Sequence, residues 1–317
     1  MSVEEFPSKT LSKSECLQSV GMPFATHYFV RPQLLPSETV FCRMTENPYT
    51  SDAALRHSRY YRIQSGRPVP ASDDTRTPDL FASAAIGAFH GFVQNPQFSC
   101  VGAKSAVAHE TVRLGVYDRL GSTDSAAGLA RDLFTFTHEP AELTDSDFVT
   151  FVAMFREPGD LDEAAFESLL WDEIRQLNRL DSPLHAWDPA VSHDPDDPHF
   201  GFSFAGTAFF VVGLHPHSSR EARRFPFPTL VFNPHAQFVR LKEAGRWSKL
   251  QEVIRSREDK LQGSLNPNLA DFGSESEARQ YSGRQVEIDW SPPITLVTEP
   301  PVRAGCPFAP NPTAKAG

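Results

Sequence analysis

The sequence predicts an α+β fold, a single domain with a central, largely antiparallel sheet flanked by helices. Hydrophobic residues make up 40% of the 317 residues and charged residues 22%, which is the balance of a globular chain with a buried core. Segments of helical periodicity are interspersed with short apolar runs of strand length. These elements do not alternate as strictly as in a parallel βαβ fold, and 205–207 has the composition of a hairpin turn.

The first 78 residues are rich in Ser, Thr and Pro and show no sustained period of 3.6 or 2. We expect an N-terminal extension (1–78) that wraps over the domain. Regular structure is expected to begin after Pro78, with a helix over 80–92. A polar break at 94–96 then leads into a tight loop at 98–100.

Two units of a strand followed by a helix are predicted next. A strand is expected over 112–117, and 122–136 begins with Ser, Thr and Asp caps and continues with helical periodicity. The apolar run 148–155 has strand length. Asp160 and Glu163 have the spacing of a capping box that begins a second helix.

The later half of the chain is predicted to be mostly antiparallel. After an acidic, Pro-rich loop (181–199), two apolar runs flank Ala205-Gly206-Thr207, as in a hairpin. The run 229–232 adds a strand. Asn233 and Pro234 are expected to supply the N-cap and the first residue of the helix that follows.

Charge and composition exclude several classes of protein. Thirty basic against forty acidic residues give a net charge of −10, which disfavours binding to a phosphate backbone. The sequence contains no run of about 18 apolar residues, so no membrane span is predicted. The acidic N-terminus does not resemble a signal peptide. A cytoplasmic location is expected. The four cysteines (Cys16, Cys42, Cys100, Cys306) lie far apart and form no CxxC pair, so reduced thiols are expected.

The common nucleotide-binding and hydrolase motifs are absent, and the distinctive segment is 209–235, where two histidine sites flank an arginine cluster. His215 follows an apolar strand, so it is either a metal ligand or a strand end held by backbone hydrogen bonds. His235 is expected at the second position of its helix, where the helix dipole and burial favour the neutral imidazole that binds metals. Packing of His235 on the sheet is the alternative.

Arg220, Arg223 and Arg224 have the spacing of one helical face. Such a face binds carboxylates or phosphates, or is simply solvated. Ten basic against five acidic residues between 216 and 260 give this region a local excess of +5. Cys100 is either a thiolate ligand or a buried structural cysteine.

The segment 276–284 is densely polar and is predicted to be a loop. It contains Glu277, Arg279, Tyr281 and Arg284. These side chains are expected either to line a substrate pocket or to lie on the surface.

Several blocks of this sequence occur in the same order as in a known family, and chance does not explain this agreement. They are FSCVGAKSA (98–106), GLHPHSSREARRF (213–225), FNPHAQF (232–238), LQGSLNPNLADFGSESEARQYSGR (261–284) and CPF (306–308). Through them the chain resembles the FPC/CPF-motif family, also called YqcI/YcgG, over about residues 80 to 290. Phe-Ser-Cys replaces Phe-Pro-Cys, and residues 291–305 separate CPF from Trp290.

The resemblance implies a haem-dependent N-hydroxylase, a monooxygenase that acts on a guanidine group of arginine or a related compound. Haem b would occupy a Phe-rich pocket, with molecular oxygen or peroxide as the oxidant. The expected iron ligand is His215 or His235, with Cys100 as the runner-up. The other residues expected to bind the cofactor are Lys104, Arg220, Arg223, Arg224, Asn233 and Arg284.

The catalytic residues implied by the resemblance lie in the block 261–284. They are Glu275, Glu277, Arg279 and Tyr281. A guanidinium substrate needs a carboxylate partner, for which Glu275, Glu277 and Asp271 are candidates and Glu110 a weaker one. The domain then spans 79–290, with 291–317 as a tail that carries the CPF motif.

Rival functions and partners stay open. The substrate is expected to be a small guanidine or amine, the electron donor is not identified, and a homo-oligomer is an open alternative. One rival is a non-haem metal-dependent oxygenase whose ligands come from His215, His217, His235, His193, Asp194 and His199. The other is a non-catalytic haem-binding protein.

Overall fold

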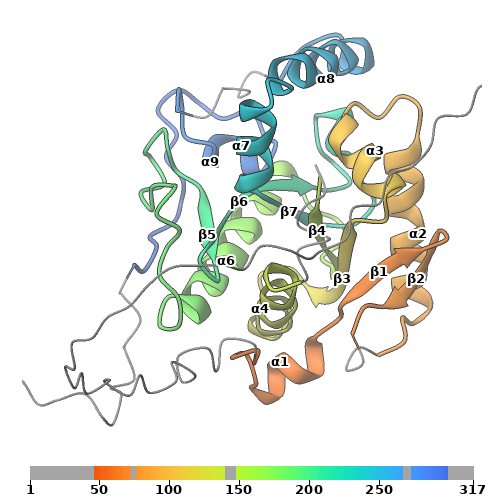
Figure 1. The fold of residues 1–317 in the computed structure, drawn as a ribbon, viewed down its shortest axis with the longest axis vertical. Coiled ribbons are helices and arrows are strands. Elements are labelled where there is room, and N and C mark those ends of the chain that lie inside the picture. The colour runs from red at the N-terminus through yellow and green to blue at the C-terminus, as the bar shows by residue number, and fades with distance from the viewer. Residues whose placement is uncertain (1–45, 73–75, 140–147, 267–272, 299–317) are drawn as a thin grey trace, which may run out of the picture. The chain divides into compact units, whose positions relative to one another are not determined.

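The computed structural model describes residues 46–72, 76–139, 148–266 and 273–298 (Figure 1). Its strands form one sheet in the order β2-β1-β3-β4-β7-β6-β5. Their bounds are β1 Tyr61–Gln64, β2 Arg67–Pro70, β3 Val112–Arg119, β4 Thr150–Glu157, β5 Phe202–Phe204, β6 Thr207–Leu214 and β7 Thr229–Pro234. β3 and β4 pair in parallel, and the other neighbours in this sheet are antiparallel. The predicted α+β fold with a largely antiparallel sheet is confirmed.

The strand directions define two edges of the sheet. β7 is antiparallel to both β4 and β6, so β6 points the same way as β3 and β4. We use the name carboxyl edge for the border of the sheet at which β3, β4 and β6 end. The amino edge is the opposite border, at which these three strands begin. β7 begins at the carboxyl edge, where Thr229 lies opposite Leu214, and ends at the amino edge, where Pro234 lies opposite Phe209.

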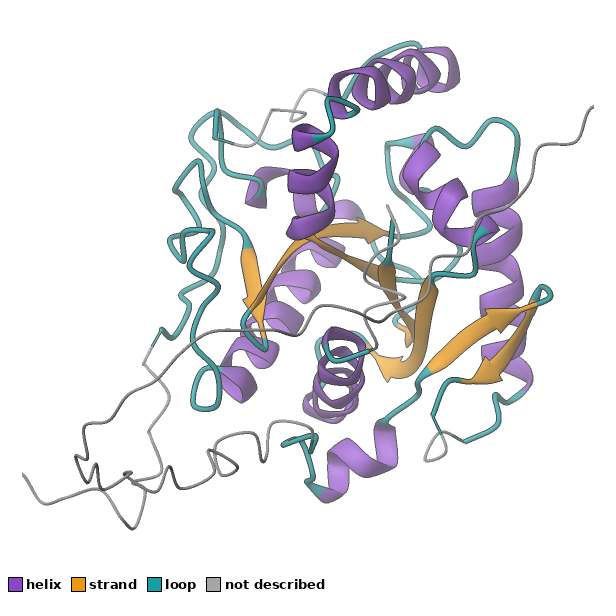
Figure 2. Cartoon of the chain, in the orientation of Figure 1, coloured by secondary structure: helices purple, strands orange, loops and turns teal. Residues whose placement is uncertain are grey.

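Helices cover both faces of the sheet (Figure 2). The helical elements are α1 Asp52–His57, α2 Leu80–Gln94, α3 Val101–Ala108, α4 Thr123–Thr137, α6 Glu163–Asp181, the 3-10 turn η1 Glu221–Arg223, α7 His235–Glu243, α8 Trp247–Gln262 and α9 Ala278–Tyr281. α4 and α6 pack on one face with α1 and α9, and α2 and α3 pack on the other. No helix in the described ranges is both long and apolar enough to cross a bilayer.

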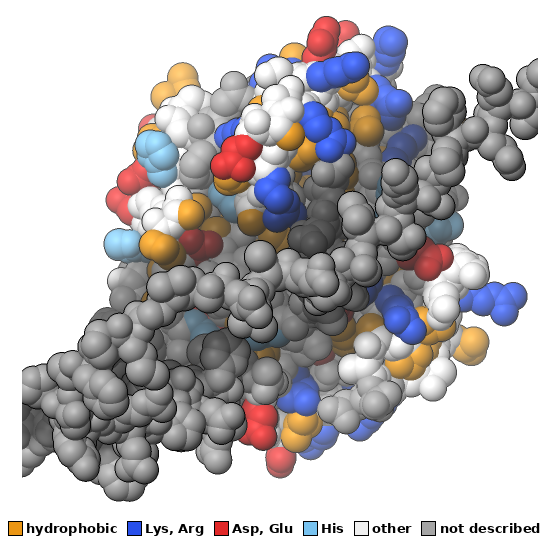
Figure 3. Space-filling view, in the orientation of Figure 1, with side chains coloured by type: hydrophobic (Ala, Val, Ile, Leu, Met, Phe, Trp, Pro, Cys, Tyr) orange, Lys and Arg blue, Asp and Glu red, His pale blue; other side chains and the backbone are white. Residues whose placement is uncertain are grey.

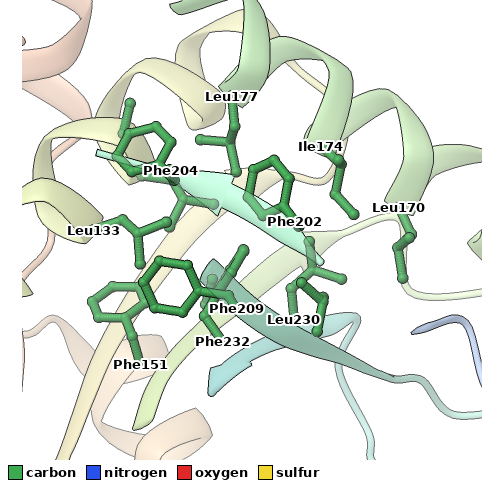
Figure 4. Close-up of a cluster of buried hydrophobic side chains, with 14 of the residues drawn as sticks. Leu133, Phe151, Leu170, Ile174, Leu177, Phe202, Phe204, Phe209, Leu230 and Phe232 are labelled. Carbon is green, nitrogen blue, oxygen red and sulfur yellow. The ribbon is translucent and has the colours of Figure 1, made fainter. Parts of the chain in front are cut away.

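The period of two along the strands divides the core between the two faces. In β4, Phe151 and Phe155 point toward α4 and α6, whereas Val152 and Met154 point toward α2 and α3. The first of these clusters is rich in phenylalanine, and Figure 4 shows Phe151, Phe202, Phe204, Phe209 and Phe232 facing leucines of α4 and α6. This cluster forms the aromatic part of the core.

Regular structure begins earlier than the predicted boundary at residue 78. α1, β1 and β2 all precede that residue, and both strands belong to the central sheet. Tyr60, Tyr61 and Ile63 are buried in the core, so this part of the chain is not a covering extension. The strands were missed because each has only four residues, too few to display a period, and β2 contains two prolines. Residues 1–45 of the predicted extension lie outside the described residues.

Smaller differences concern helix starts. α6 is capped by Asp162, whose carboxylate accepts the N–H of Ala165 at 2.7 Å, and not by Asp160. α7 begins at His235, because Asn233 and Pro234 still belong to β7. Several residues named in the sequence analysis lie outside the described residues, namely Cys16, Cys42, Asp271 and the CPF motif with Cys306.

Candidate functional site

His215 follows β6 directly at the carboxyl edge, and its side chain is completely buried. Its ring stacks on Phe166 of α6, with 4.4 Å between ring centroids. Neither ring nitrogen makes a hydrogen bond of normal length and angle to a described residue, although the backbone of Leu161 lies close enough to raise the pKa of the ring. Burial lowers the pKa of this imidazole to about 4, so the ring is neutral at pH 7. A neutral, unpartnered imidazole is the form of histidine that coordinates a metal.

The three arginines after His215 do not share one helical face. η1 is a single 3-10 turn over Glu221–Arg223, so Arg220 and Arg224 flank it as its N-cap and C-cap and no α-helical face is formed. Arg220 is buried and donates to Glu258 at 2.7 Å. Arg223 donates to the carbonyl of Tyr281 at 3.1 Å, and burial lowers its pKa to about 10. Arg224 is exposed and pairs with the acidic residue of η1. The predicted common face was therefore wrong.

Cys100 and Lys104 belong to the start of α3, which the sequence did not predict as a helix. Cys100 is the N-cap, and its Sγ accepts the N–H of Ala103 at 3.4 Å. Burial raises the pKa of the Cys100 thiol, which disfavours the thiolate that a metal requires. The Lys104 ammonium donates to the carbonyls of Asn95 at 2.7 Å and Pro96 at 3.3 Å. Lys104 thus joins α3 to the end of α2, whereas Cys100 caps α3 itself.

A second polar cluster lies at the amino edge. His235, the first residue of α7, places its Nε2 3.0 Å from a carboxylate oxygen of Glu277. The buried hydroxyl of Tyr281 donates to the same carboxylate at 2.6 Å and accepts the N–H of Phe202 at 3.1 Å. Burial raises the pKa of the Glu277 carboxyl, and its bonds to His235 and Tyr281 oppose that rise. The Glu277 carboxylate is thus already bonded to two side chains of the protein, His235 and Tyr281.

The two candidate iron ligands lie at opposite edges of the sheet. His215 follows the end of β6, and His235 follows the end of β7, which runs antiparallel to β6. The six residues of β7 separate the two edges by roughly 20 Å at about 3.3 Å per residue. A single metal ion therefore has no access to both histidines in this fold.

The segment 276–284 is a correction to the predicted loop. Ala278–Tyr281 form α9, and Glu277 and Tyr281 are buried. Its polar side chains, whose density suggested a loop, instead bond to groups within the core. Arg284 pairs with the buried Glu167 at 2.9 Å.

The remaining predicted residues of this block lie nearer the surface. Arg279 donates to the carbonyl of Glu287 at 2.6 Å, and its guanidinium lies over the ring of Trp290. Glu275 is exposed and lies 3.7 Å from Arg279. The structure therefore brings Glu277, Tyr281 and His235 together but leaves Glu275 outside that group.

The other side chains predicted to bind cofactor, substrate or metal also bond to groups of the protein itself. The side-chain amide of Asn233 donates to the carbonyl of Phe210 at 3.2 Å, so it ties β7 to β6. Glu110 accepts the N–H of Ser65 at 2.9 Å in an exposed position. His217 pairs with the exposed Asp160 at 3.0 Å.

The histidine-rich non-haem site finds no support in the described ranges. They contain no group of three or more His, Cys, Asp or Glu side chains that could hold a metal ion. Its proposed ligands also include His215 and His235, which the sheet separates.

Glu173 is a buried carboxyl that the sequence analysis did not single out. It lies on α6 with no exposed surface, and its Oε2 accepts the N–H of Gly121 at 2.7 Å. Its Oε1 has no partner among the described residues, and burial raises the pKa to about 8. The signal was available, because Glu173 lies seven residues after Phe166 on the same helical stripe.

The basic excess noted in the sequence gathers on one part of the surface. Lys and Arg side chains lie over α7 and α8 (Figure 3), although the whole chain carries a net charge of −10. α8 has no buried residue, and its Glu258 is the partner of Arg220. This helix thus covers the side chain of Arg220 and presents its basic residues outward.

Comparison with known proteins assigns the chain to a family. The model of the YqcI/YcgG family matches residues 89–295, about two thirds of the sequence. The chain belongs to the YqcI/YcgG family. Among relatives, YcgG of Bacillus subtilis (strain 168) is 29% identical over 149 residues, which cover 44% of this chain and 58% of YcgG. YqcI of the same organism is 24% identical over 200 residues, 60% of this chain and 77% of YqcI. Both are described as uncharacterized, and no solved structure matches.

The region matched by the YqcI/YcgG family model covers most elements of the fold but not the first ones. It begins within α2 and ends after α9, so it contains His215, the arginines, His235 and Glu277. It leaves out α1, β1 and β2, which complete the sheet beyond β3. The candidate residues at both edges therefore belong to the family region, whereas the strands that cover β3 do not.

Proposed function

We propose that this YqcI/YcgG protein is a haem-dependent N-hydroxylase that acts on a guanidine group, of arginine or a related compound. The proposal follows from the family resemblance of the motif blocks. The observation that supports it within the structure is His215, a fully buried imidazole whose nitrogens lack a partner among the described residues. Unpartnered buried polar atoms cost stability and are expected to have a reason to persist.

The chemistry of the surrounding residues fits haem b. His215 offers a neutral imidazole for the iron, and Phe166 supplies apolar surface beside it. Arg224 is exposed and is the arginine of this cluster best placed to meet a propionate. Bound haem would supply the activation of oxygen or peroxide that N-hydroxylation needs. Because the His215 ring is packed on Phe166, haem reaches it only when neighbouring side chains move.

The structure suggests a different carboxylate for the substrate than the sequence did. After burial, the charge of Glu163 is the largest influence on the pKa of His215, so this carboxylate lies near the imidazole. Its Oε1 accepts the N–H and the hydroxyl of Ser219 at 2.9 and 2.7 Å. Under the proposal, Glu163 pairs with the guanidinium. Glu277 and Tyr281 act as positioning residues of the core, because their polar atoms are bonded to each other at the amino edge.

Spectra of the haem-loaded protein test the ligand. We expect His215→Ala to lose the Soret band, while His235→Ala and Cys100→Ala keep it. Arginine and simple guanidines should perturb the spectrum of the wild type. With added peroxide, or with oxygen and an electron donor, mass spectrometry should detect a product with one added oxygen. Glu163→Gln should retain haem and weaken the perturbation by guanidines.

Two results would contradict the proposal at different points. Haem retained in His215→Ala, with a thiolate-type spectrum of the carbon monoxide complex, would move the ligand to Cys100. Haem bound without any oxidised or spectrally active guanidine would leave a haem-binding protein of another function.

A further inference from the structure

A separate cavity of about 160 Å³ lies at the carboxyl-terminal end of α6. Its walls are the last turn of α6, the loop 182–187 and the segment Val297 and Thr298. Val297 is fixed in place, because the Asn178 side chain donates to its carbonyl at 3.0 Å and accepts its N–H at 2.7 Å. The cavity is therefore formed by well-anchored parts of the chain.

A histidine held by an aspartate lines this cavity. The Nδ1 of His185 lies 2.7 Å from Asp181, which is four residues earlier and buried. The Asp181 carboxylate also accepts the hydroxyl of Tyr49 at 2.6 Å and the N–H of Ala205 at 3.0 Å. These three donors fix the carboxylate, which in turn holds the His185 ring in one orientation.

The same wall contains a polar group that the described residues do not satisfy. The indole nitrogen of Trp187 is buried and has no hydrogen-bond partner among them. Trp187 packs against Phe200 and Phe202, so its ring is fixed from behind by the core. Apolar surface of Ala186 and Val297 completes the lining. The lining thus combines apolar surface with polar side chains, among which the Asp181–His185 pair is held in one orientation.

This site is distinct from the region of His215. Phe166, which stacks on His215, and Asp181 are fifteen residues apart on α6. At about 1.5 Å per residue, the two ends are roughly 22 Å apart along the helix axis. A ligand in this cavity therefore has no contact with an iron ion held by His215.

We propose that this cavity is a binding site for a compact molecule that carries one polar hydrogen-bonding group for the imidazole of His185. A cavity of about 150 Å³ accommodates a benzene ring, so the ligand has about six to nine non-hydrogen atoms. Its apolar part packs on Ala186, Val297 and the Trp187 ring. The polar group is required because the His185 imidazole lines the cavity and is held in place by Asp181 through Nδ1. The inference does not depend on the proposed haem chemistry.

The test uses phenol as the probe and benzene as its matched control without a donor. Titration into the full-length ¹⁵N-labelled protein is followed at the indole N–H signals, with Trp187 assigned from Trp187→Phe. Phenol should shift the Trp187 signal and saturate. Benzene should bind about tenfold more weakly, because it offers no hydrogen bond to the His185 imidazole.

Two variants of the same loop separate the cavity from general apolar binding. Ala186→Phe fills the cavity and should abolish phenol binding, while Ala190→Phe, an exposed position outside the lining, should leave it unchanged. His185→Phe should reduce the preference for phenol over benzene to about one. Equal binding of phenol and benzene by the wild type, saturation in Ala186→Phe, or no shift of Trp187 with phenol would each overturn the proposal.

Discussion

The buried imidazole of His215 makes the folded state sensitive to acid. Burial lowers its pKa from 6.5 to about 4, so between these values the unfolded chain binds a proton that the folded chain does not. The stability that depends on a neutral His215 is complete above pH 6.5 and is lost as the pH falls toward 4. Each unit of this pKa difference corresponds to about 1.4 kcal/mol.

His215→Phe is expected to remove this acid sensitivity. The new ring has a similar shape, stacks on Phe166 and has no nitrogen to protonate. Urea unfolding at several pH values between 4 and 6.5 should show a flatter stability profile than the wild type. His193→Phe is the matched control, because His193 is exposed and should keep the wild-type profile. An unchanged slope in His215→Phe would mean that another group carries the acid response.

Sequence reasoning identified individual residues better than their partners. His215 was recognisable because it follows an apolar strand, and His235 because it precedes a helix. The partner of His235 was not recognisable, since Glu277 lies 42 residues away and is placed by the packing of α9. The burial of Glu277 and Tyr281 contradicted the expectation that a dense polar segment lies in a loop. Bonds among these side chains offset the cost of burying them.

Among the secondary-structure elements, α6 provides a direct comparison of two acidic residues near a helix start. Asp162→Ala should lower the free energy of unfolding by about 1 kcal/mol, because its carboxylate caps the N–H of Ala165. Asp160→Ala should change it by less than about 0.5 kcal/mol, since Asp160 is exposed and pairs only with His217. Thermal or denaturant unfolding measures both. Equal losses in the two variants would show that the capping assignment is wrong.

Elements with long periodic patterns were predicted, whereas several short elements, namely β1, β2 and α9, were not. α2, α4 and α6 each contain at least fifteen residues, enough for several turns of apolar spacing. β1, β2 and α9 have four residues each, so their formation depends on contacts with the sheet. The direction of β6 relative to β4 followed from pairing through β7, which no local pattern reveals.

For the whole molecule, the strands outside the family match are expected to be necessary for folding. A chain that starts at residue 79 lacks β1 and β2. β3 then becomes the outermost strand, and the backbone groups on one of its sides have no partner strand. It also loses the buried Tyr60, Tyr61 and Ile63, roughly 5 to 9 kcal/mol of apolar burial. Because a typical domain is stable by about 5–15 kcal/mol, we expect poor solubility and no cooperative thermal transition by circular dichroism. A cooperative transition within a few degrees of the full chain would refute this expectation.

The position of α9 also determines when the molecule completes its core during synthesis. Tyr281 bonds to Phe202 and Phe209, yet it leaves the ribosome long after them. At roughly 5 to 20 residues per second, roughly 4 to 14 seconds separate the translation of Phe209 from that of Tyr281. During this interval the nascent β5–β6 hairpin presents uncovered aromatic side chains. The emerging chain is therefore expected to depend on chaperones that shield apolar surface until its last buried helix arrives.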